Sequence, residues 1–155
     1  MSVSHEERFH RNVLDFAALL IELNDKCHQK GYGAIDQGIL RVAEAALRNF
    51  SPITIISSFC HHSRPFWDKI RHHDEDSLKD SLSVIFSNLP VDLSPQIIKL
   101  IETKDYTGNR VIDQQDIDDV WSYLEALVKI GLKWSYQEAP SKELENEARA
   151  WGIKF

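Results

Sequence analysis

Glycine, proline and cysteine are scarce in this sequence. Its 155 residues include 6 glycines, 5 prolines and 2 cysteines. Collagen-like and low-complexity chains need far more Gly and Pro, and small disulfide scaffolds need more Cys, so the sequence excludes these classes. Because 43% of the residues are hydrophobic, we expect one ordinary domain with a real core. Such a domain needs no disulfide, so Cys27 and Cys60 are expected to be free thiols.

Long apolar runs are also lacking. The longest stretches, such as Phe16–Leu20 and Val84–Phe86, are far shorter than the roughly 18 to 20 residues of a membrane-spanning helix. The charged residues Glu6, Glu7 and Arg8 stand where the apolar run of a secretory signal would lie. We therefore expect no membrane association and an intracellular, cytoplasmic location.

Positive charge is in deficit. The chain has 18 Lys and Arg against 24 Asp and Glu, which gives a formal net charge of −6. Nonspecific nucleic-acid binding depends on Lys and Arg that neutralise phosphates, and the sequence contains no local basic cluster. Nucleic acid is therefore not an expected partner.

Catalytic signatures are missing as well. The sequence has no nucleophile elbow, no phosphate-binding glycine loop and no zinc-protease helix motif. Histidines and a cysteine gather at Cys60-His61-His62 and His72-His73, but this spacing does not supply the four converging ligands that zinc requires. We interpret them as polar residues at the solvent ends of helices, and a pH-sensitive contact there stays open. The sequence predicts a protein that is not an enzyme and has no organic cofactor.

Helical periodicity, with start and stop signals, dominates the chain. Ser4-His5-Glu6-Glu7 is a capping box, and apolar residues then recur at spacings of three and four until Lys30, before Gly31. Further helices are expected at about 36–50, 52–59, 65–70, 78–86, 95–101 and 117–134. The apolar face of the 36–50 helix consists of Ile39, Leu40, Val42, Ala43, Ala46, Leu47 and Phe50. The β-branched residues after Pro52 leave a strand open for the 52–59 segment.

These segments predict an all-α fold, a compact single-domain bundle of about six to seven helices that contains a helix-loop-helix unit. The domain is expected to cover residues 1–140. Residues 141–155 are polar until Arg149 and then carry Trp151, Ile153 and Phe155. We expect a short helical tail that docks on the domain or on a partner, with Trp151 and Phe155 as exposed partner-binding anchors.

The segment from residue 105 to residue 116 resembles the twelve-residue calcium loop of the EF-hand family. Oxygen ligands are required at positions one, three, five, seven, nine and twelve, where the sequence has Asp105, Thr107, Asn109, the carbonyl of Val111, Asp113 and Asp116. Two positions depart from the pattern, because Arg110 replaces the glycine at position six and Asp116 replaces a bidentate glutamate. The resemblance therefore implies at most weak binding of calcium or magnesium.

The same segment has a simpler interpretation as an ordinary connection between two helices. Gly108-Asn109 would turn the chain, Asp113 would cap the following helix, and Asp116 would lie in its first turn. Because acidic residues at helix starts are common, we place helix capping first and cation binding second.

Three stretches carry a further resemblance. The sequences FCHHSRPFWDKI at 59–70, DED at 74–76 and VWSYLEALVKI at 120–130 resemble uncharacterised helical proteins of large DNA viruses. This resemblance implies a viral structural or accessory role, with a virion as one location, and carries over no functional residue. The sequence as a whole favours a non-enzymatic module that binds a protein partner or self-associates through its acidic surface and aromatic tail. A calcium- or magnesium-responsive regulator is the alternative.

Overall fold

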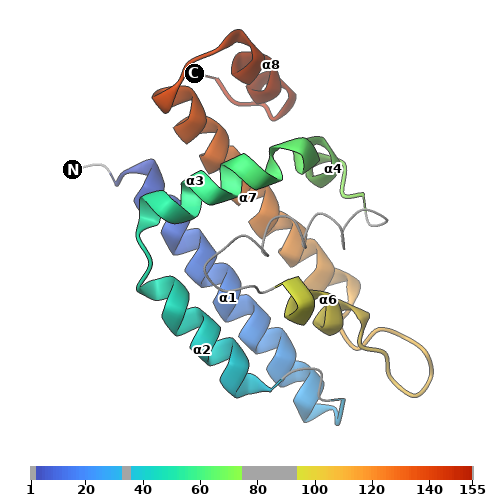
Figure 1. Cartoon of the computed structure of the whole chain (residues 1–155). Helices are drawn as coiled ribbons and strands as arrows, with labels where there is room; N and C mark the ends of the chain where they lie inside the picture. The colour runs from blue at the N-terminus through green and yellow to red at the C-terminus, as the bar shows by residue number, and fades with distance from the viewer. Residues whose placement is uncertain (1–2, 33–35, 75–93, 155) are drawn as a thin grey trace.

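The computed structural model describes residues 3–32, 36–74 and 94–154, and these form a compact bundle of helices (Figure 1). The elements are α1 (His5–Gln29), α2 (Gln37–Arg48), α3 (Pro52–Ser63), the 3₁₀ turn η1 (Arg64–Phe66), α4 (Trp67–Arg71), α6 (Ser94–Glu102), α7 (Gln114–Glu138) and α8 (Lys142–Ala150). An isolated β-bridge joins Lys104 to Arg110, and the described ranges contain no strand. The predicted all-α class is confirmed, and the 52–59 segment is helical. The helix expected at 78–86 lies outside the described residues.

Local capping sets where several helices begin. The Ser4 hydroxyl accepts a hydrogen bond from the backbone N–H of Glu7 at 3.2 Å, as the capping box predicts for α1. The Ser141 hydroxyl does the same for the N–H of Leu144 at 3.1 Å and starts α8. Pro52 occupies the first position of α3, where the missing N–H of proline has no helical partner to lose.

Two helices of 25 residues each, α1 and α7, form the centre of the bundle. They run antiparallel side by side, and α2 and α3 pack on α1 while α3, α4 and α8 pack on α7 (Figure 1). The Trp134 indole N–H donates to Glu6 Oε1 at 2.9 Å and so joins the end of α7 to the start of α1. The largest fully buried side chains are Phe9, Phe16, Phe59, Leu20, Leu47, Ile55, Ile56, Ile70 and Ile97. No described helix is both long enough and apolar enough to cross a membrane.

The helices α3 and α7 approach each other closely at Gly131. A Cβ atom placed on Gly131 would lie 2.9 Å from Cys60 Sγ, so only glycine allows this spacing. The Cys60 thiol donates to the Gly131 carbonyl at 3.6 Å. Burial raises the pKa of the Cys60 thiol to about 11 and also raises the pKa of Cys27. Both cysteines are free and buried, in agreement with the expectation of free thiols.

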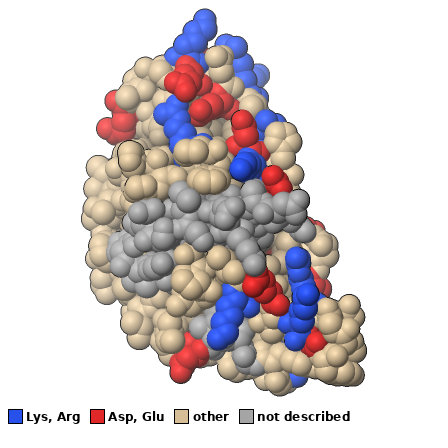
Figure 2. Space-filling view, turned by 45° about the vertical axis from the view of Figure 1, so that its right-hand side comes forward, with Lys and Arg blue, Asp and Glu red and all other residues tan. Residues whose placement is uncertain are grey.

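The C-terminal tail lies against the chain's own domain. Leu144, Ala148 and Trp151 are buried on the side of α8 that packs on α7. The Tyr136 hydroxyl of α7 donates to Glu145 Oε1 at 3.0 Å, and Arg64 of η1 lies 3.5 Å from Glu147. Figure 2 shows that acidic and basic side chains are interspersed at the upper end of the molecule, where α8 lies.

Candidate functional site

The first half of the 105–116 loop is organised by Asp105. Its Oδ1 accepts hydrogen bonds from the backbone N–H groups of Thr107 at 2.9 Å and Asn109 at 3.1 Å, and from the Thr107 hydroxyl. The Thr107 hydroxyl and then the backbone donors hold the pKa of the Asp105 carboxyl below its ordinary value. The oxygens assigned to loop positions one and three thus contact each other.

The turn of this loop falls on Gly108 rather than on Arg110. Gly108 has φ +84°, in the left-handed region that favours glycine, whereas φ of Arg110 is negative. The bridge between Lys104 and Arg110 closes the loop, with the Val111 N–H donating to the Thr103 carbonyl at 3.0 Å. Val111 and Ile112 are 5% and 1% exposed, so the second half of the loop is anchored in the core.

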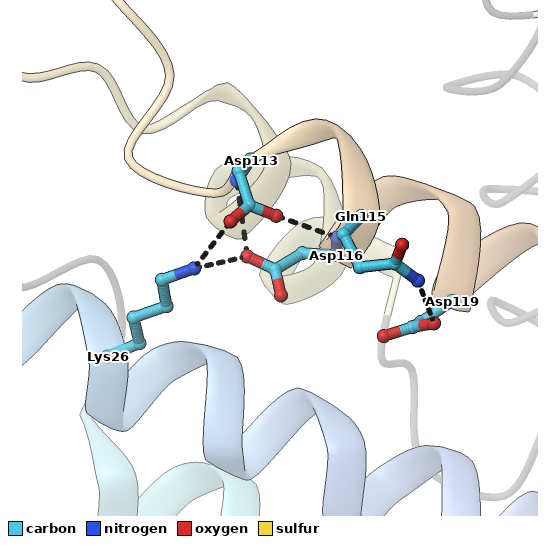
Figure 3. Close-up of polar contacts among 5 residues, drawn as sticks. All are labelled: Lys26, Asp113, Gln115, Asp116 and Asp119. Carbon is cyan, nitrogen blue, oxygen red and sulfur yellow. Dashed lines mark hydrogen bonds and ion pairs between the residues drawn. The ribbon is translucent and has the colours of Figure 1, made fainter.

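Asp113 and Asp116 form a reciprocal capping box at the start of α7 (Figure 3). Asp113 Oδ1 accepts from the Asp116 N–H at 2.9 Å, and Asp116 Oδ2 accepts from the Asp113 N–H at 3.1 Å. The helix capping that the sequence pattern predicts is therefore present. These bonds place two carboxylates side by side at one helix end.

Lys26, near the end of α1, supplies the opposite charge. Its Nζ lies 2.6 Å from Asp116 Oδ2 and 3.3 Å from Asp113 Oδ2 (Figure 3). The Asp116 hydrogen bond is the main cause that raises the pKa of Lys26. The backbone N–H of Asp116, and then Lys26, lower the pKa of Asp113. Sequence reasoning missed Lys26 because it is 87 and 90 residues away from these acids and no local pattern links them.

The residues that the EF-hand pattern assigns to a cation therefore fall into two groups. Asp105, Thr107 and Asn109 bond to one another at the turn, while Asp113 and Asp116 share the capping box and Lys26. In the described part of the chain, no cluster of three or more His, Cys, Asp or Glu side chains is arranged to hold a metal ion. These oxygens would have to exchange their present partners to coordinate calcium or magnesium, and cation binding here stays a prediction.

A second candidate site is an exposed apolar surface on α2 and the first turn of α3. We define the α2–α3 apolar surface by Ile39, Val42, Phe50 and Ile53, which are 51%, 71%, 38% and 53% exposed. The sequence pattern placed the first three in the apolar face of this helix, but the structure leaves them exposed. Only Leu40, Ala43 and Leu47 of α2 are buried, because the apolar arc of α2 is wider than the contact that α1 makes with it.

Trp151, one of the two partner-binding anchors predicted in the tail, is buried rather than exposed. Trp151 is 9% exposed and belongs to the core, and Phe155 lies outside the described residues. A partner could contact the face of Trp151 only if the tail left α7. The anchor role of Trp151 and Phe155 stays a prediction.

The histidines of the 60–73 segment do not converge on one point. His61 and His62 contact each other edge to face on α3, with ring centroids 4.7 Å apart, and His72 Nδ1 contacts the Asp68 carbonyl at 2.7 Å. His73 instead stacks on Trp121 of α7, with centroids 5.0 Å apart and rings 2° from parallel, and its Nε2 contacts Glu125 Oε1.

The backbone of His73 is unusual in the same place. Its φ of 51° makes it the only described non-glycine residue with a positive φ. The His73 N–H bonds to the Ile70 carbonyl at 3.1 Å and the Asp74 N–H to the Lys69 carbonyl at 3.0 Å, which is a Schellman ending for α4. Glycine normally fills this position, so the stack on Trp121 offsets a backbone cost. Comparisons with family models, with curated proteins and with solved structures find no match for this chain.

Proposed function

We propose that this chain is a non-enzymatic α-helical module that works by binding protein. The observation that carries the proposal is the α2–α3 apolar surface. Of the six large hydrophobic side chains recorded as exposed in the described ranges, four lie between residues 39 and 53. Single exposed apolar residues are ordinary, whereas a gathering of them typically marks a contact surface.

The chemistry of this surface favours a partner that packs an apolar helix or groove against it. Ile39, Val42 and Ala46 recur at intervals of three and four residues along one face of α2, and Phe50 and Ile53 follow in the turn after α2 and on the first turn of α3. None of the five carries a charge, so the same surface on a second copy is a suitable partner. The resemblance to helical proteins of large DNA viruses favours a structural or accessory role in a virion or an infected cell.

Sedimentation velocity over a range of concentrations tests self-association. We expect the unaltered chain to associate as concentration rises and Val42→Glu to stay monomeric, because the new carboxylate would be buried unpaired. Tyr106→Glu is the matched control, since Tyr106 is 90% exposed but lies on the loop, and it should associate normally. If the unaltered chain is monomeric throughout, the partner must be another protein. A photocrosslinker at position 42 that captures no protein in either case would reject the proposal.

The 105–116 loop favours a second function, a calcium- or magnesium-responsive regulator. The observation in its favour is the EF-hand spacing of the oxygen-bearing residues from Asp105 to Asp116, which includes two carboxylates side by side at the start of α7. Calorimetric titration of calcium, then magnesium, into chelator-treated protein tests it, with Asp105→Ala and Asp116→Asn as controls. Saturable heat that both variants lose would support the regulator, and no heat up to millimolar calcium would reject it.

A further inference from the structure

The start of α7 places two carboxylates beside each other, and the backbone N–H groups of the capping box stabilise them only in part. Asp113 and Asp116 must each accept the other's backbone N–H to form the capping box, so both carboxylates are held at one helix end. Two negative charges held close together each disfavour the ionised form of the other. In calcium-binding loops, a bound cation neutralises such carboxylates.

Lys26 is placed to do this without a bound ion. Its Nζ lies within 3.3 Å of an oxygen from each carboxylate, and the closer one, Asp116, has a side chain only 17% exposed. We infer that Lys26 is the cation of this loop, and that its ammonium, tethered to α1, neutralises Asp113 and Asp116 and fixes the start of α7 to the end of α1. This inference concerns how the loop is held together; it is independent of the proposed protein-binding function and opposes the cation-responsive alternative, because Lys26 and a bound ion would use the same carboxylates.

The neighbours of Lys26 show that this turn of α1 is a junction of three helices. Asn24 Nδ2 donates to Gln37 Oε1 at 2.7 Å, and the Gln37 amide donates to Asp25. Gln37 is the first residue of α2. Consecutive residues of one turn therefore hold the start of α2 through hydrogen bonds of the Gln37 amide and the start of α7 through the charge of Lys26. Loss of the Lys26 charge should loosen the loop and leave the start of α2 unchanged.

The test measures amide hydrogen exchange by residue, together with thermal unfolding of the full chain. Lys26→Met keeps the length of the side chain and removes its charge. We expect several-fold faster exchange at the amides of Asp116 and Ile117, a lower melting temperature, and unchanged exchange in α2. Lys30→Met is the matched control, because Lys30 follows one turn later and is exposed. Because the charge of Lys30 acts on Asp105, this variant should leave exchange at Asp116 and Ile117 unchanged.

A second substitution tests whether Lys26 acts by neutralising the carboxylates or only by packing against them. Asp116→Asn keeps an oxygen for the Asp113 N–H and removes one of the two like charges. In the Lys26→Met background it should therefore recover part of the lost protection, whereas on its own it should be destabilising. Equal exchange in Lys26→Met and Lys30→Met would overturn the inference. Additive losses in the double variant would overturn it as well, because they would mean that Lys26 and Asp116 act separately.

Calcium addition to the unaltered protein gives an independent readout. The ammonium and a metal ion would compete for the same oxygen of Asp116, so millimolar calcium should leave the melting temperature of the unaltered protein unchanged. A rise in that temperature would overturn the inference. Self-association of Lys26→Met, measured by sedimentation, should equal that of the unaltered chain, so failure of this inference and failure of the proposed function are distinguishable.

Discussion

The start and the second half of α7 add different contacts to one shared buried face. At its start, Ile117 is buried, and a capping box and the charge of Lys26 are partly exposed beside it. In its second half, Leu127 is fully buried and Gly131 lies directly against Cys60 of α3. Exposed ion pairs contribute little to the free energy of unfolding, whereas buried side chains contribute much. We conclude that packing holds α7 in the bundle along its length and that the charge of Lys26 adds a smaller contribution at its start.

The largest expected effect comes from a cavity in the second half of α7. Leu127 is 0% exposed, so Leu127→Ala should lower the free energy of unfolding by about 2–5 kcal/mol. Urea unfolding followed by circular dichroism measures this loss. Ser122→Ala, on the exposed side of the same helix, should change it by less than about 0.5 kcal/mol. Similar losses in the two variants would contradict the comparison.

The close crossing of α3 and α7 should be next in size. Gly131→Ala places a Cβ 2.9 Å from Cys60 Sγ, and the resulting overpacking should lower the free energy of unfolding by about 1–3 kcal/mol. Cys60→Ala removes the sulfur that the new methyl meets. The double variant should therefore be more stable than the sum of the two single losses predicts, when measured in the same urea experiment. Strict additivity would show that the contact is not the cause.

Replacing His73, which stacks on Trp121 and contacts Glu125, should lower the free energy of unfolding by an intermediate amount. His73→Ala loses the stack on Trp121, worth about 0.5–1.5 kcal/mol for an aromatic pair, and keeps the backbone cost of φ 51°. His73→Gly loses the same stack but removes that backbone cost. Differential scanning calorimetry should thus find His73→Gly more stable than His73→Ala. The reverse order would mean that the left-handed backbone is not strained.

The smallest change in stability should come from the charges at the start of α7, and its dependence on pH identifies them as the cause. Asp113 has a lowered pKa, so its contribution is present above its ordinary value of 3.8 and is lost as pH falls through the lowered value. Lys26 has a raised pKa, so its contribution is present below 10.5 and is lost as pH rises through the raised value. The difference in melting temperature between the unaltered protein and Lys26→Met should be constant near neutral pH and shrink at both extremes. A difference independent of pH would assign the effect to packing.

The sequence predicts the helices well where the signals are local. Ser4 and Pro52 mark helix starts that the structure confirms, because a cap or an N-terminal proline acts within one turn. Asp113 was likewise identified as a cap from its place before an apolar run. Helix ends and helix faces that depend only on neighbouring residues are therefore within reach of sequence reasoning.

The rest depends on which helices meet. The apolar arc of α2 includes Val42, but only the position of α1 decides that Leu40 is covered and Val42 is not. Lys26 has no signal that points to Asp116, since only the antiparallel packing of α1 and α7 brings them together. The sequence predicted a tail that docks on the domain or on a partner, and only the packing of α8 on α7 decides that Trp151 is buried on the chain's own domain. These properties arise from tertiary packing rather than from local pattern.

The placement of the four tryptophans gives the chain a built-in set of optical reporters. The Trp67 indole N–H donates to Ser63 Oγ at 2.8 Å, so its fluorescence reports on the junction of α3 and α4. The fluorescence of Trp121 reports on the stack with His73. Trp134 senses the contact of the chain start with α7 through Glu6, and Trp151 senses the docked tail. Replacing three of the four by Phe would leave one intrinsic emitter at a single junction. Fluorescence from such variants would then time the opening of each junction separately and show which part of the bundle loosens first.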